Sequence, residues 1–334
     1  MTNYIYCCDW GTSSLRIRLI SIQSQEIIDQ ETDKHGIADL YDEWVLVNTF
    51  DKDKRRVDFY LSKLEEHLRK IADRNDLTTD KIPVVISGMA SSSIGIVDLP
   101  YAELPFTLEG HNAVVYHIDA SPIFNHRVLL LSGVKDGDEV MRGEEVHLIG
   151  IAGVLSSLKA KDQITVLLPG THSKHVSIRN GNIAGIETYI TGELFAIVSK
   201  HGLLKEAVQS PENAVDGIDW DVFIDGVNYS GSTTLLQALF KVRTNQLFNR
   251  LSKQQNYSYL SGLLIGFELR SLLNKPNTQL VLCCGENLNE HYKKALTCLG
   301  LDKMTYFLNP FDVEKAIVKG QIILAHKYLN PIIR

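Results

Sequence analysis

The order of strand-like segments and polar turns is repeated along this chain of 334 residues. In the first half, three strand-like segments are separated by turns, and a helix and a fourth strand follow them. The helix is indicated by apolar residues at alternating spacings of four and three, namely Val57, Leu61, Leu64, Leu68 and Ile71. The strands are expected at residues 4–8, 15–20, 26–31 and 82–88, and the last of them ends at a glycine.

The second half follows the same order. Its first strand leads into the polar turn at residues 169–173, as the first strand of the chain leads into a polar turn at residues 9–14. Asn180-Gly181 is a strong signal for a tight hairpin. A helix is expected to begin near Thr191, whose hydroxyl suits a helix N-cap. The strands are expected at residues 163–168, 174–179, 183–189 and 280–284, and Gly285 closes the last one.

This duplication predicts an α/β protein of two domains with the same topology, assigned to residues 1–140 and 141–334. Two facing domains with paired polar turns would form a cleft in which backbone amides and hydroxyl groups hold a polyphosphate from both sides. The length suits two domains, and the content of 44% apolar and 22% charged residues is ordinary for a globular protein.

The net charge and the cysteine spacing argue against two classes of function, nucleic-acid binding and zinc binding through thiolates. The formal net charge of −6 indicates no basic surface for nucleic acid. The 5 cysteines follow no zinc-binding spacing, and Cys7-Cys8 and Cys283-Cys284 lie in apolar runs where buried thiols are expected. No signal peptide or membrane-spanning stretch is recognised. We therefore expect a cytoplasmic protein without nucleic-acid or membrane partners.

The segment that begins at Asp9 carries the groups that phosphoryl transfer requires, which are positioning donors, positive charge and a metal ligand. Asp9, at the end of a buried strand, is expected to hold Mg²⁺ through water and so to take part in catalysis. Taken alone, the segment is also compatible with an ordinary hairpin, and the duplication favours the nucleotide site. The residues expected to bind phosphate are Gly11, Thr12, Ser13, Ser14 and Arg16.

This segment resembles the first phosphate motif of the carbohydrate kinases. Five further segments occur in the expected order along most of the chain, and the whole set resembles the 2-dehydro-3-deoxygalactonokinase family. With Cys8–Gly11, the segments are Ile86–Met89, Val140–Glu145, Leu168–Lys174, Thr191–Leu194 and Ser261–Gly266.

The resemblance implies a fold of two actin-like, ribonuclease H-like domains that face an ATP cleft. It implies an ATP-dependent carbohydrate kinase that uses Mg²⁺ and phosphorylates the terminal (C6) hydroxyl of 2-keto-3-deoxygalactonate, a sugar acid of galactonate catabolism. A homodimer is compatible with this reading.

Three alternatives stay open at this point. The same fold serves kinases of other sugars or sugar acids, such as 2-keto-3-deoxygluconate, although a neutral sugar would not need Arg142 and Lys174. A non-catalytic sugar-binding regulator of this superfamily would carry a DNA-binding module before the first turn, which here begins at residue 9. An actin-like filament protein or chaperone ATPase would hydrolyse ATP without a sugar acceptor.

In related sugar kinases a carboxylate at the start of a helix is the general base toward the sugar hydroxyl. Glu144 or Glu145 falls in the matching place, before the helix-like stretch Val146–Leu155, although the usual residue is Asp. The alternative is that the two glutamates only complement the helix dipole. Between the two, Glu144 is favoured as the base.

The acceptor side is assigned to residues near this segment and after the strand at 82–88. Arg142 can bind a substrate carboxylate with two hydrogen bonds, or it can form a surface ion pair with a neighbouring glutamate. Gly88, Met89 and Ser91 are assigned to the sugar pocket, with a plain polar loop as the alternative.

In the second turn, Gly170 and Thr171 are expected to face the β- or γ-phosphate. The superfamily usually has an acidic residue here, and this chain has none. His172 and Lys174 add positive charge toward phosphate or the sugar acid, with a solvated turn histidine as the alternative for His172. Glu193, in the Thr191–Leu194 motif, is assigned to the substrate.

Glycines mark the expected adenosine side. Gly285 occupies the position where related kinases lay the adenine on a glycine-bearing loop, and it is assigned to the nucleotide. Gly262 and Gly266 lie on one helical face, where they either contact adenosine or permit tight helix packing. Of these two readings, helix packing is favoured.

Overall fold

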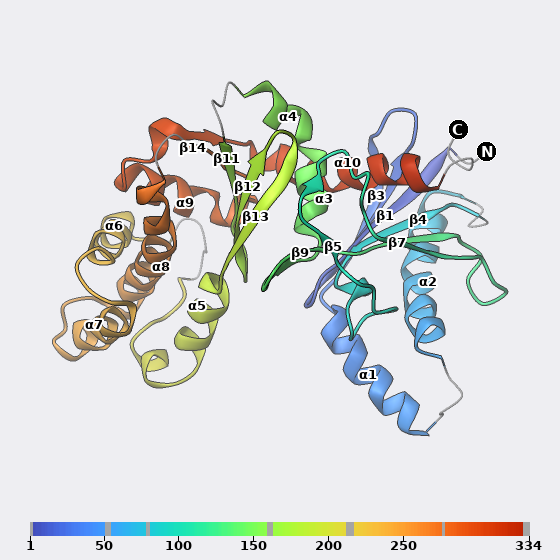
Figure 1. Cartoon of the computed structure of the whole chain (residues 1–334). Helices are drawn as coiled ribbons and strands as arrows, with labels where there is room; N and C mark the ends of the chain where they lie inside the picture. The colour runs from blue at the N-terminus through green and yellow to red at the C-terminus, as the bar shows by residue number, and fades with distance from the viewer. Residues whose placement is uncertain are drawn as a thin grey trace. The chain divides into compact units, whose positions relative to one another are not determined.

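The computed structural model describes residues 3–50, 55–77, 81–158, 163–211, 217–275 and 278–329 (Figure 1). The chain divides into two compact units. The first consists of Met1–Ser157, Gly181–Ala184 and Glu314–Arg334, and the second of Leu158–Asn180 and Gly185–Val313. The domain limits expected at residues 140 and 141 stay a prediction, while residues 141–157 and the C-terminal helix group with the first unit by contact.

The first unit is built on a mixed sheet with the strand order β3-β2-β1-β4-β8-β7. β1 is antiparallel to β2 and parallel to β4, so that Asp9 lies opposite Arg16 on one side and Ser87 on the other. A smaller sheet has the order β10-β9-β5. The strands are β1 (Tyr4–Trp10), β2 (Leu15–Ser21), β3 (Ile27–Asp33), β4 (Val84–Gly88), β5 (Ala102–Glu103), β6 (Phe106–Thr107), β7 (Val115–Ile118), β8 (Val128–Leu131), β9 (Val134–Asp136) and β10 (Glu139–Met141).

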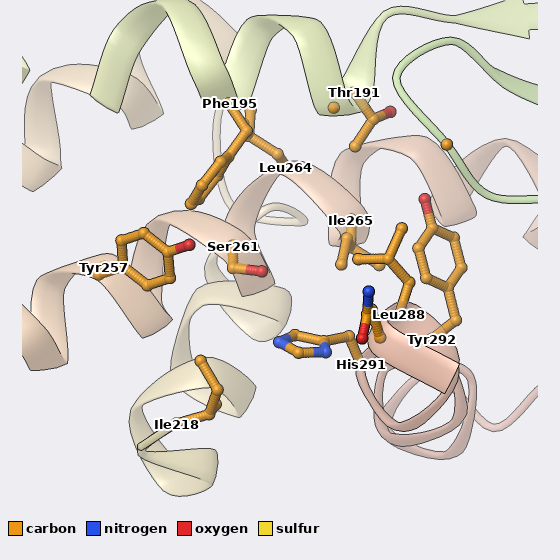
Figure 2. Close-up of a pocket in the computed structure, with 13 residues that line it drawn as sticks. Thr191, Phe195, Ile218, Tyr257, Ser261, Leu264, Ile265, Leu288, His291 and Tyr292 are labelled. Carbon is orange, nitrogen blue, oxygen red and sulfur yellow. The ribbon is translucent and has the colours of Figure 1, made fainter. Parts of the chain in front are cut away.

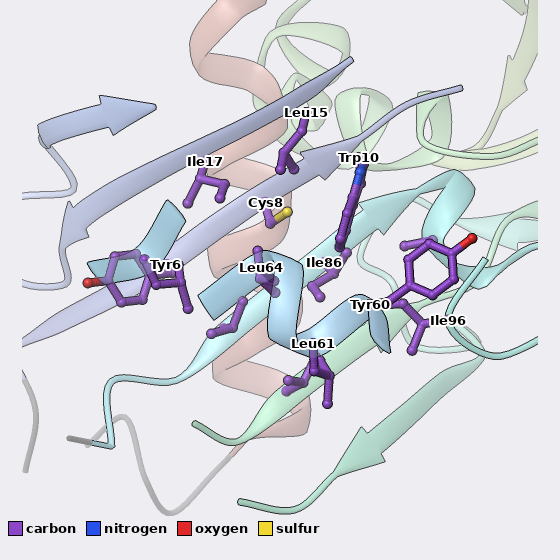
Figure 3. Packing of buried hydrophobic residues seen from close by; sticks show 14 of the residues in the cluster. Tyr6, Cys8, Trp10, Leu15, Ile17, Tyr60, Leu61, Leu64, Ile86 and Ile96 are labelled. Atoms are coloured by element: carbon purple, nitrogen blue, oxygen red, sulfur yellow. The ribbon is translucent and has the colours of Figure 1, made fainter. Parts of the chain in front are cut away.

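Helix α2 (Arg56–Arg74) covers one face of the large sheet, since its apolar stripe is buried. Figure 3 shows Tyr60, Leu61 and Leu64 of α2 packed toward Cys8 and Trp10 of β1. Spacings of three and four residues place the apolar side chains of α2 on one face, and their burial removes that face from water. The remaining helices of this unit are α1 (Ile37–Phe50), η1 (Met89–Ser91), α3 (Glu144–Gly150), α4 (Ala152–Ser157) and α10 (Pro310–Tyr328).

Helix α10 returns to the N-terminal strands, beside which it is drawn in red in Figure 1. The side chain of Gln321 is fully buried, and its Nε2 donates to the carbonyl of Cys8 at 2.7 Å and to Ser87 Oγ at 2.9 Å. α10 also packs closely on α3, because a Cβ on Gly150 would lie 1.8 Å from the carbonyl oxygen of Ala316. This contact fixes α3 against the first unit.

The second unit repeats the strand order of the first, with β13-β12-β11-β14-β15 in place of β3-β2-β1-β4-β8. β11 is antiparallel to β12 and parallel to β14, and β14 is parallel to β15. Asn180 and Gly181 both have positive φ, as a tight hairpin turn requires. The strands are β11 (Gln163–Leu168), β12 (Ser173–Arg179), β13 (Asn182–Tyr189), β14 (Thr278–Leu282) and β15 (Thr305–Phe307).

Helices α6 and α8 of the second unit pack at close range through glycines. A Cβ on Gly262 would lie 1.9 Å from the carbonyl oxygen of Phe223, and one on Gly266 would lie 2.6 Å from Ser230 Oγ. The packing interpretation of these two glycines is therefore confirmed. The helices of this unit are α5 (Thr191–Lys200), η2 (Leu203–Glu206), α6 (Trp220–Tyr229), α7 (Leu235–Leu247), α8 (Lys253–Leu269), η3 (Arg270–Asn274), α9 (Glu286–Cys298) and η4 (Asp302–Met304).

The predicted α/β fold with two halves of the same topology is confirmed, strand by strand. Two local predictions were wrong. Thr191 is not the N-cap of α5, which is Ile190, because the Thr191 hydroxyl bonds a buried carboxylate instead. The stretch expected as one helix over Val146–Leu155 is two helices, and the first already begins at Glu144. Within the described residues, no helix has the length and apolarity needed to cross a bilayer.

Candidate active site

The first polar turn, between β1 and β2, is held by main-chain hydrogen bonds. The amide of Gly11 donates to the carbonyl of Ser14 at 2.9 Å. From the start of α1, the amides of Ile37 and Ala38 donate to the carbonyls of Gly11 and Thr12 at 3.0 and 3.1 Å. Thr12 itself is exposed. The turn thus has a fixed backbone and an accessible outer side.

Asp9 lies one residue before the end of β1 and has a half-buried carboxylate. Arg16 Nη1 lies 3.7 Å from Asp9 Oδ2, and the Arg16 side chain is about half exposed. Gly88 has a positive φ and passes next to this carboxylate, since a Cβ there would lie 3.5 Å from Asp9 Oδ1 and 2.7 Å from the carbonyl oxygen of Trp10. A side chain at residue 88 would therefore crowd the end of β1.

The surroundings of Asp9 fit the demands of Mg²⁺. This ion is usually held by one or two carboxylates, with water and substrate phosphates completing its coordination. Across the described part of the chain, no group of three or more His, Cys, Asp or Glu side chains is arranged to hold a metal ion. A single carboxylate beside an accessible turn is the arrangement that leaves room for water and phosphate.

A pair of carboxylates lies at the start of α3. Gly143 has φ +110°, and a Cβ on it would lie 3.4 Å from the Cα of Gly88. Glu144 Oε2 accepts from the amide of Arg142 at 2.9 Å, and Glu145 Oε2 accepts from the amide of Gly143 at 2.8 Å. The close approach of two glycines therefore brings this segment to the end of β4, beside the strand that ends in Asp9.

The two glutamates differ in environment although they are adjacent. Glu145 is 2% exposed, whereas Glu144 is half-buried. Burial, and secondly the charge of Glu144, raise the pKa of Glu145 to about 8. Glu145 Oε1 is buried and has no hydrogen-bond partner among the described residues. At neutral pH Glu145 is therefore mostly protonated.

Arg142 is oriented by residues on the loop after β4. Its Nη1 donates to the Ser91 hydroxyl at 2.5 Å and also to the Ser91 carbonyl, and the guanidinium carbon lies 4.2 Å from the centre of the Tyr101 ring. Its Nε is buried without a hydrogen-bond partner among the described residues. Ser91 and Met89 form the short helix η1 directly after Gly88. Ser91 therefore acts first as a support for Arg142.

The second polar turn, between β11 and β12, is contacted by the first turn of α5. The amide of Glu193 donates to the carbonyl of Thr171 at 3.0 Å. A Cβ on Gly192 would lie 2.5 Å from the carbonyl oxygen of Gly170 and 2.8 Å from the Cα of Thr171. Only glycine permits this approach, which gives a physical reason for the Thr191–Leu194 motif.

Charged side chains surround the second turn. His172 Nε2 lies 2.5 Å from Glu193 Oε2, and both side chains are about half exposed. Lys174 is 5% exposed, and its ammonium group donates to the carbonyl of His172 at 3.0 Å. Lys174 thus stabilises the turn from inside, whereas the His172–Glu193 pair is accessible.

A pocket of about 240 Å³ adjoins the second turn and has mainly apolar walls (Figure 2). Figure 2 shows the ring of Phe195 on α5 near Tyr257 on α8, and the two rings contact edge to face with centroids 4.9 Å apart. The ring of His291, which lines the pocket, packs against the ring of Trp220. Burial lowers the pKa of His291. The lining comprises Gly170, Thr191, Gly192, Phe195, Ile218, Tyr257, Ser261, Leu264, Ile265, Asn287, Leu288, His291 and Tyr292.

Comparison with known proteins identifies the family. The family model of 2-keto-3-deoxy-galactonokinase matches residues 9–321. The chain belongs to the 2-keto-3-deoxy-galactonokinase family. Membership makes it an ATP-dependent carbohydrate kinase.

Curated relatives of this family member cover most of its length. A probable 2-dehydro-3-deoxygalactonokinase from Rhizobium meliloti (strain 1021) is 27% identical over 95% of each chain. The 2-dehydro-3-deoxygalactonokinase of Escherichia coli (strain K12) is 29% identical over 68% of this chain and 76% of its own. A crystal structure of a Sinorhizobium meliloti protein provisionally named 2-dehydro-3-deoxygalactonokinase has a TM-score of 0.75 at 26% identity, covering 98% of this chain and 100% of that one.

In this kinase, most of the residues assigned from the sequence lie in two groups, one in each unit. The first unit brings together the first turn, Gly88, and the segment Arg142–Glu145, and the second brings together the second turn and Glu193. Gly285 lies outside the pocket lining, although Asn287 and Leu288 follow it into the pocket.

Sequence analysis missed the aromatic walls of the pocket, including Phe195, Tyr257 and Tyr292. A signal was present for some of the wall, because Ser261, Leu264 and Ile265 belong to the Ser261–Gly266 motif. The kinase residues Phe195 and Tyr257 come from separate helices, and no local pattern links them.

Proposed function

We propose that this kinase transfers the γ-phosphoryl group of ATP to the terminal (C6) hydroxyl of 2-keto-3-deoxygalactonate. The names of its relatives support the sugar acid as substrate. The observation that carries the residue assignment is the contact between Gly88 and Gly143, because it gathers one metal-binding carboxylate, one accessible glutamate and one arginine in a single unit.

The nucleotide is assigned to the second unit. The base and ribose occupy the apolar pocket between α5, α8 and α9, whose size and aromatic walls suit a flat ring system. Gly170 lines this pocket and Thr171 follows it in the turn, so that both can direct amide and hydroxyl groups to the phosphates. In the first unit, the turn from Gly11 to Ser14 and Arg16 bind the transferred group.

Asp9 would hold Mg²⁺ through water, and the ion would neutralise charge that develops on the phosphates during transfer. The Asp9 carboxylate suits this role because it is half-buried and lies one residue before the end of β1. Arg16, whose Nη1 lies 3.7 Å from Asp9 Oδ2, adds positive charge on the accessible side of the turn.

The sugar acid is assigned to the first unit. Arg142 binds the substrate carboxylate, since its guanidinium is held in one orientation by Ser91 and Tyr101. Glu144 takes the proton of the acceptor hydroxyl as its oxygen attacks the γ-phosphorus. The bond from the γ-phosphorus to the β–γ bridging oxygen breaks, and ADP leaves with that oxygen.

Glu144 is preferred over Glu145 as the base because a base must be both accessible and ionised. Glu145 is almost fully buried, and its raised pKa keeps it protonated at neutral pH. Its role in this proposal is to hold the amide of Gly143, and thus to fix the bend that presents Glu144.

A coupled assay of ADP release with ATP, Mg²⁺ and a panel of sugar acids tests the substrate. Turnover on 2-keto-3-deoxygalactonate above the epimeric gluconate acid and neutral sugars is expected, and absence of turnover on every keto-deoxy acid would contradict the proposal.

Separate Glu144→Gln and Glu145→Gln variants test the base. Loss of the base is expected to lower kcat roughly 10²–10⁴-fold, and the loss should occur in Glu144→Gln. A wild-type kcat that rises with a midpoint near pH 8, together with loss of activity in Glu145→Gln, would identify Glu145 as the base instead.

A further inference from the structure

A buried carboxylate near the end of α8 joins the structural parts of the nucleotide pocket. Glu268 is 3% exposed and accepts hydrogen bonds from two hydroxyl groups on one oxygen. Tyr292 of α9 donates to its Oε2 at 2.8 Å, and the Thr191 hydroxyl at the start of α5 donates to the same oxygen. Its Oε1 lies 3.2 Å from His175 Nε2 on β12. Four separate elements therefore meet at one carboxylate.

The network continues from Glu268 to the second polar turn. The Tyr292 hydroxyl lies 3.1 Å from Ser173 Oγ, and the amide of Gly170 donates to Ser173 Oγ at 3.4 Å. Each hydroxyl can accept from one neighbour and donate to the next, so the chain has a consistent direction from Gly170 to Glu268. Gly170, Thr191 and Tyr292 also line the pocket.

Burying a carboxylate costs desolvation free energy, and packed apolar residues of similar volume often stabilise a fold at least as well. The carboxylate accepts hydrogen bonds from donors on several elements, and it thereby fixes the positions of these elements relative to one another. Here the donors belong to the wall of the pocket and to the strand behind the turn.

We propose that Glu268 is a positioning residue of the nucleotide site, which aligns the second phosphate turn with the adenosine pocket. The inference rests on the proposed function, in which base and phosphates of one nucleotide occupy these two places. Glu268 does not touch the nucleotide, and it acts through Thr191, Tyr292 and Ser173.

Alignment has a specific thermodynamic signature. Adenosine needs only the pocket, whereas ADP needs the pocket and the turn in the correct relative position. The ratio of the two dissociation constants therefore measures the alignment. A residue that only stabilises the fold would change the melting temperature and leave the ratio unchanged.

The test is isothermal titration of adenosine and of ADP with Mg²⁺ into wild type and Glu268→Gln. Gln keeps the shape, but its NH2 nitrogen donates hydrogen bonds and cannot accept them, so one of the two accepting positions of Glu268 is lost. We expect the affinity advantage of ADP over adenosine to fall about tenfold or more, and the KM for ATP to rise while the KM for the sugar acid stays within twofold.

Asn245→Ala is the matched control, because Asn245 is a buried polar residue of the same unit that bonds Asn256, outside the pocket lining. It should lower the melting temperature and leave the ratio unchanged. An unchanged ratio in Glu268→Gln, or an equal fall in Asn245→Ala, would overturn the positioning role. Failure of wild type to bind both ADP and adenosine would instead refute the proposed nucleotide site.

Milder variants keep the test decisive if Glu268→Gln fails to fold. Thr191→Val and Tyr292→Phe each remove one hydroxyl that donates to the same oxygen of Glu268. Their effects on the ratio should be coupled in the double variant, since both act through that oxygen. If the effect of the double variant on the ratio equals the product of the two single effects within a factor of two, the inference is overturned.

Discussion

The two polar turns follow the same strand of two sheets with the same strand order, yet they carry different chemistry. In the first unit, the turn starts at Asp9, which lies opposite Arg16 in the antiparallel pair. In the second, the last strand residue Leu168 lies opposite Lys174, and the turn has no acidic residue. A single backbone plan thus presents a carboxylate at the first turn and no acidic residue in the second.

The turns also differ in how they are held. Main-chain amides of α1 support the first turn, so its shape depends little on the side chains that surround it. Side chains support the second turn through Ser173, Tyr292 and Glu268. The comparison teaches that a repeated topology fixes where a turn occurs, whereas its chemistry and its tolerance of substitution are set independently in each unit.

The largest effect is expected at the carboxylate that has no counterpart in the second turn. Asp9→Asn should lower kcat by roughly 10²–10³-fold, because it removes charge that orients the metal ion in the transition state. The variant should also need more Mg²⁺ for half-maximal rate. Steady-state assays over a Mg²⁺ series measure both effects.

Asp33→Asn is the matched control for Asp9, because Asp33 is a half-buried aspartate on the same sheet that pairs with His35. It should retain nearly normal kcat. Equal losses in the two variants would mean that any carboxylate of this sheet matters, and the contrast between the turns would disappear.

The second turn should be most sensitive at the glycine that allows α5 to approach it. Gly192→Ala places a Cβ against the backbone of residues 170 and 171 and should displace the turn, raising the KM for ATP about tenfold. Gly153→Ala, at a helical position with open space around it, should behave as wild type. A Gly192→Ala variant with an unchanged KM for ATP would show that the turn does not contact phosphate.

Substitution of Arg142 should affect binding of the sugar acid, which is assigned to the first unit, and leave binding of ATP unchanged. Arg142→Lys keeps the charge but loses the planar group that stacks on Tyr101, and it should raise the KM for the sugar acid roughly tenfold. The KM for ATP should stay the same. If the KM for ATP rises and that for the sugar acid does not, Arg142 belongs to the nucleotide side.

The last prediction concerns stability at the start of α3 and does not involve a substrate. The folded-state pKa of Glu145 is about 8, above its unfolded value of about 4.5, so the folded state binds the proton more tightly. Its contribution to stability is therefore full below about pH 4.5 and is lost as pH rises toward 8, by at most about 1.4 kcal/mol per pH unit. The free energy of unfolding of Glu145→Gln should therefore lack this decline with pH, which we call the slope, when measured by urea unfolding at pH 5.5, 7.0 and 8.5.

A companion variant checks the cause of that slope. In Glu144→Gln the slope should end at lower pH, because the charge of Glu144 contributes to the raised pKa of Glu145. Identical slopes in wild type and in Glu145→Gln would show that Glu145 does not titrate in this range.

Local patterns were sufficient for the strands and for the places of the two turns. Apolar runs and alternation specify strands, and Asn180-Gly181 specifies a hairpin, because each depends on residues close together in the chain. The duplicated order of these segments then predicted two halves of the same topology. Asp9, Gly88 and Gly170 could be singled out for the same reason, since each ends a predicted strand or directly follows one.

Packing between distant segments decided the rest. Glu144 and Glu145 are the same residue type in sequence, and only the packing around α3 determines that Glu145 is the buried one. Thr191 has the composition of an N-cap, but a carboxylate 77 residues away takes its hydroxyl.

The sequence by itself therefore determined the repeated strand order and the strand ends to which the groups for phosphoryl transfer are assigned. The tertiary structure alone decided which glutamate is buried, how Arg142 is oriented, and that Glu268 joins the second turn to the pocket. The physical reason is that strand and turn preferences act over a few residues, whereas burial and hydrogen bonding depend on side chains that only folding brings together.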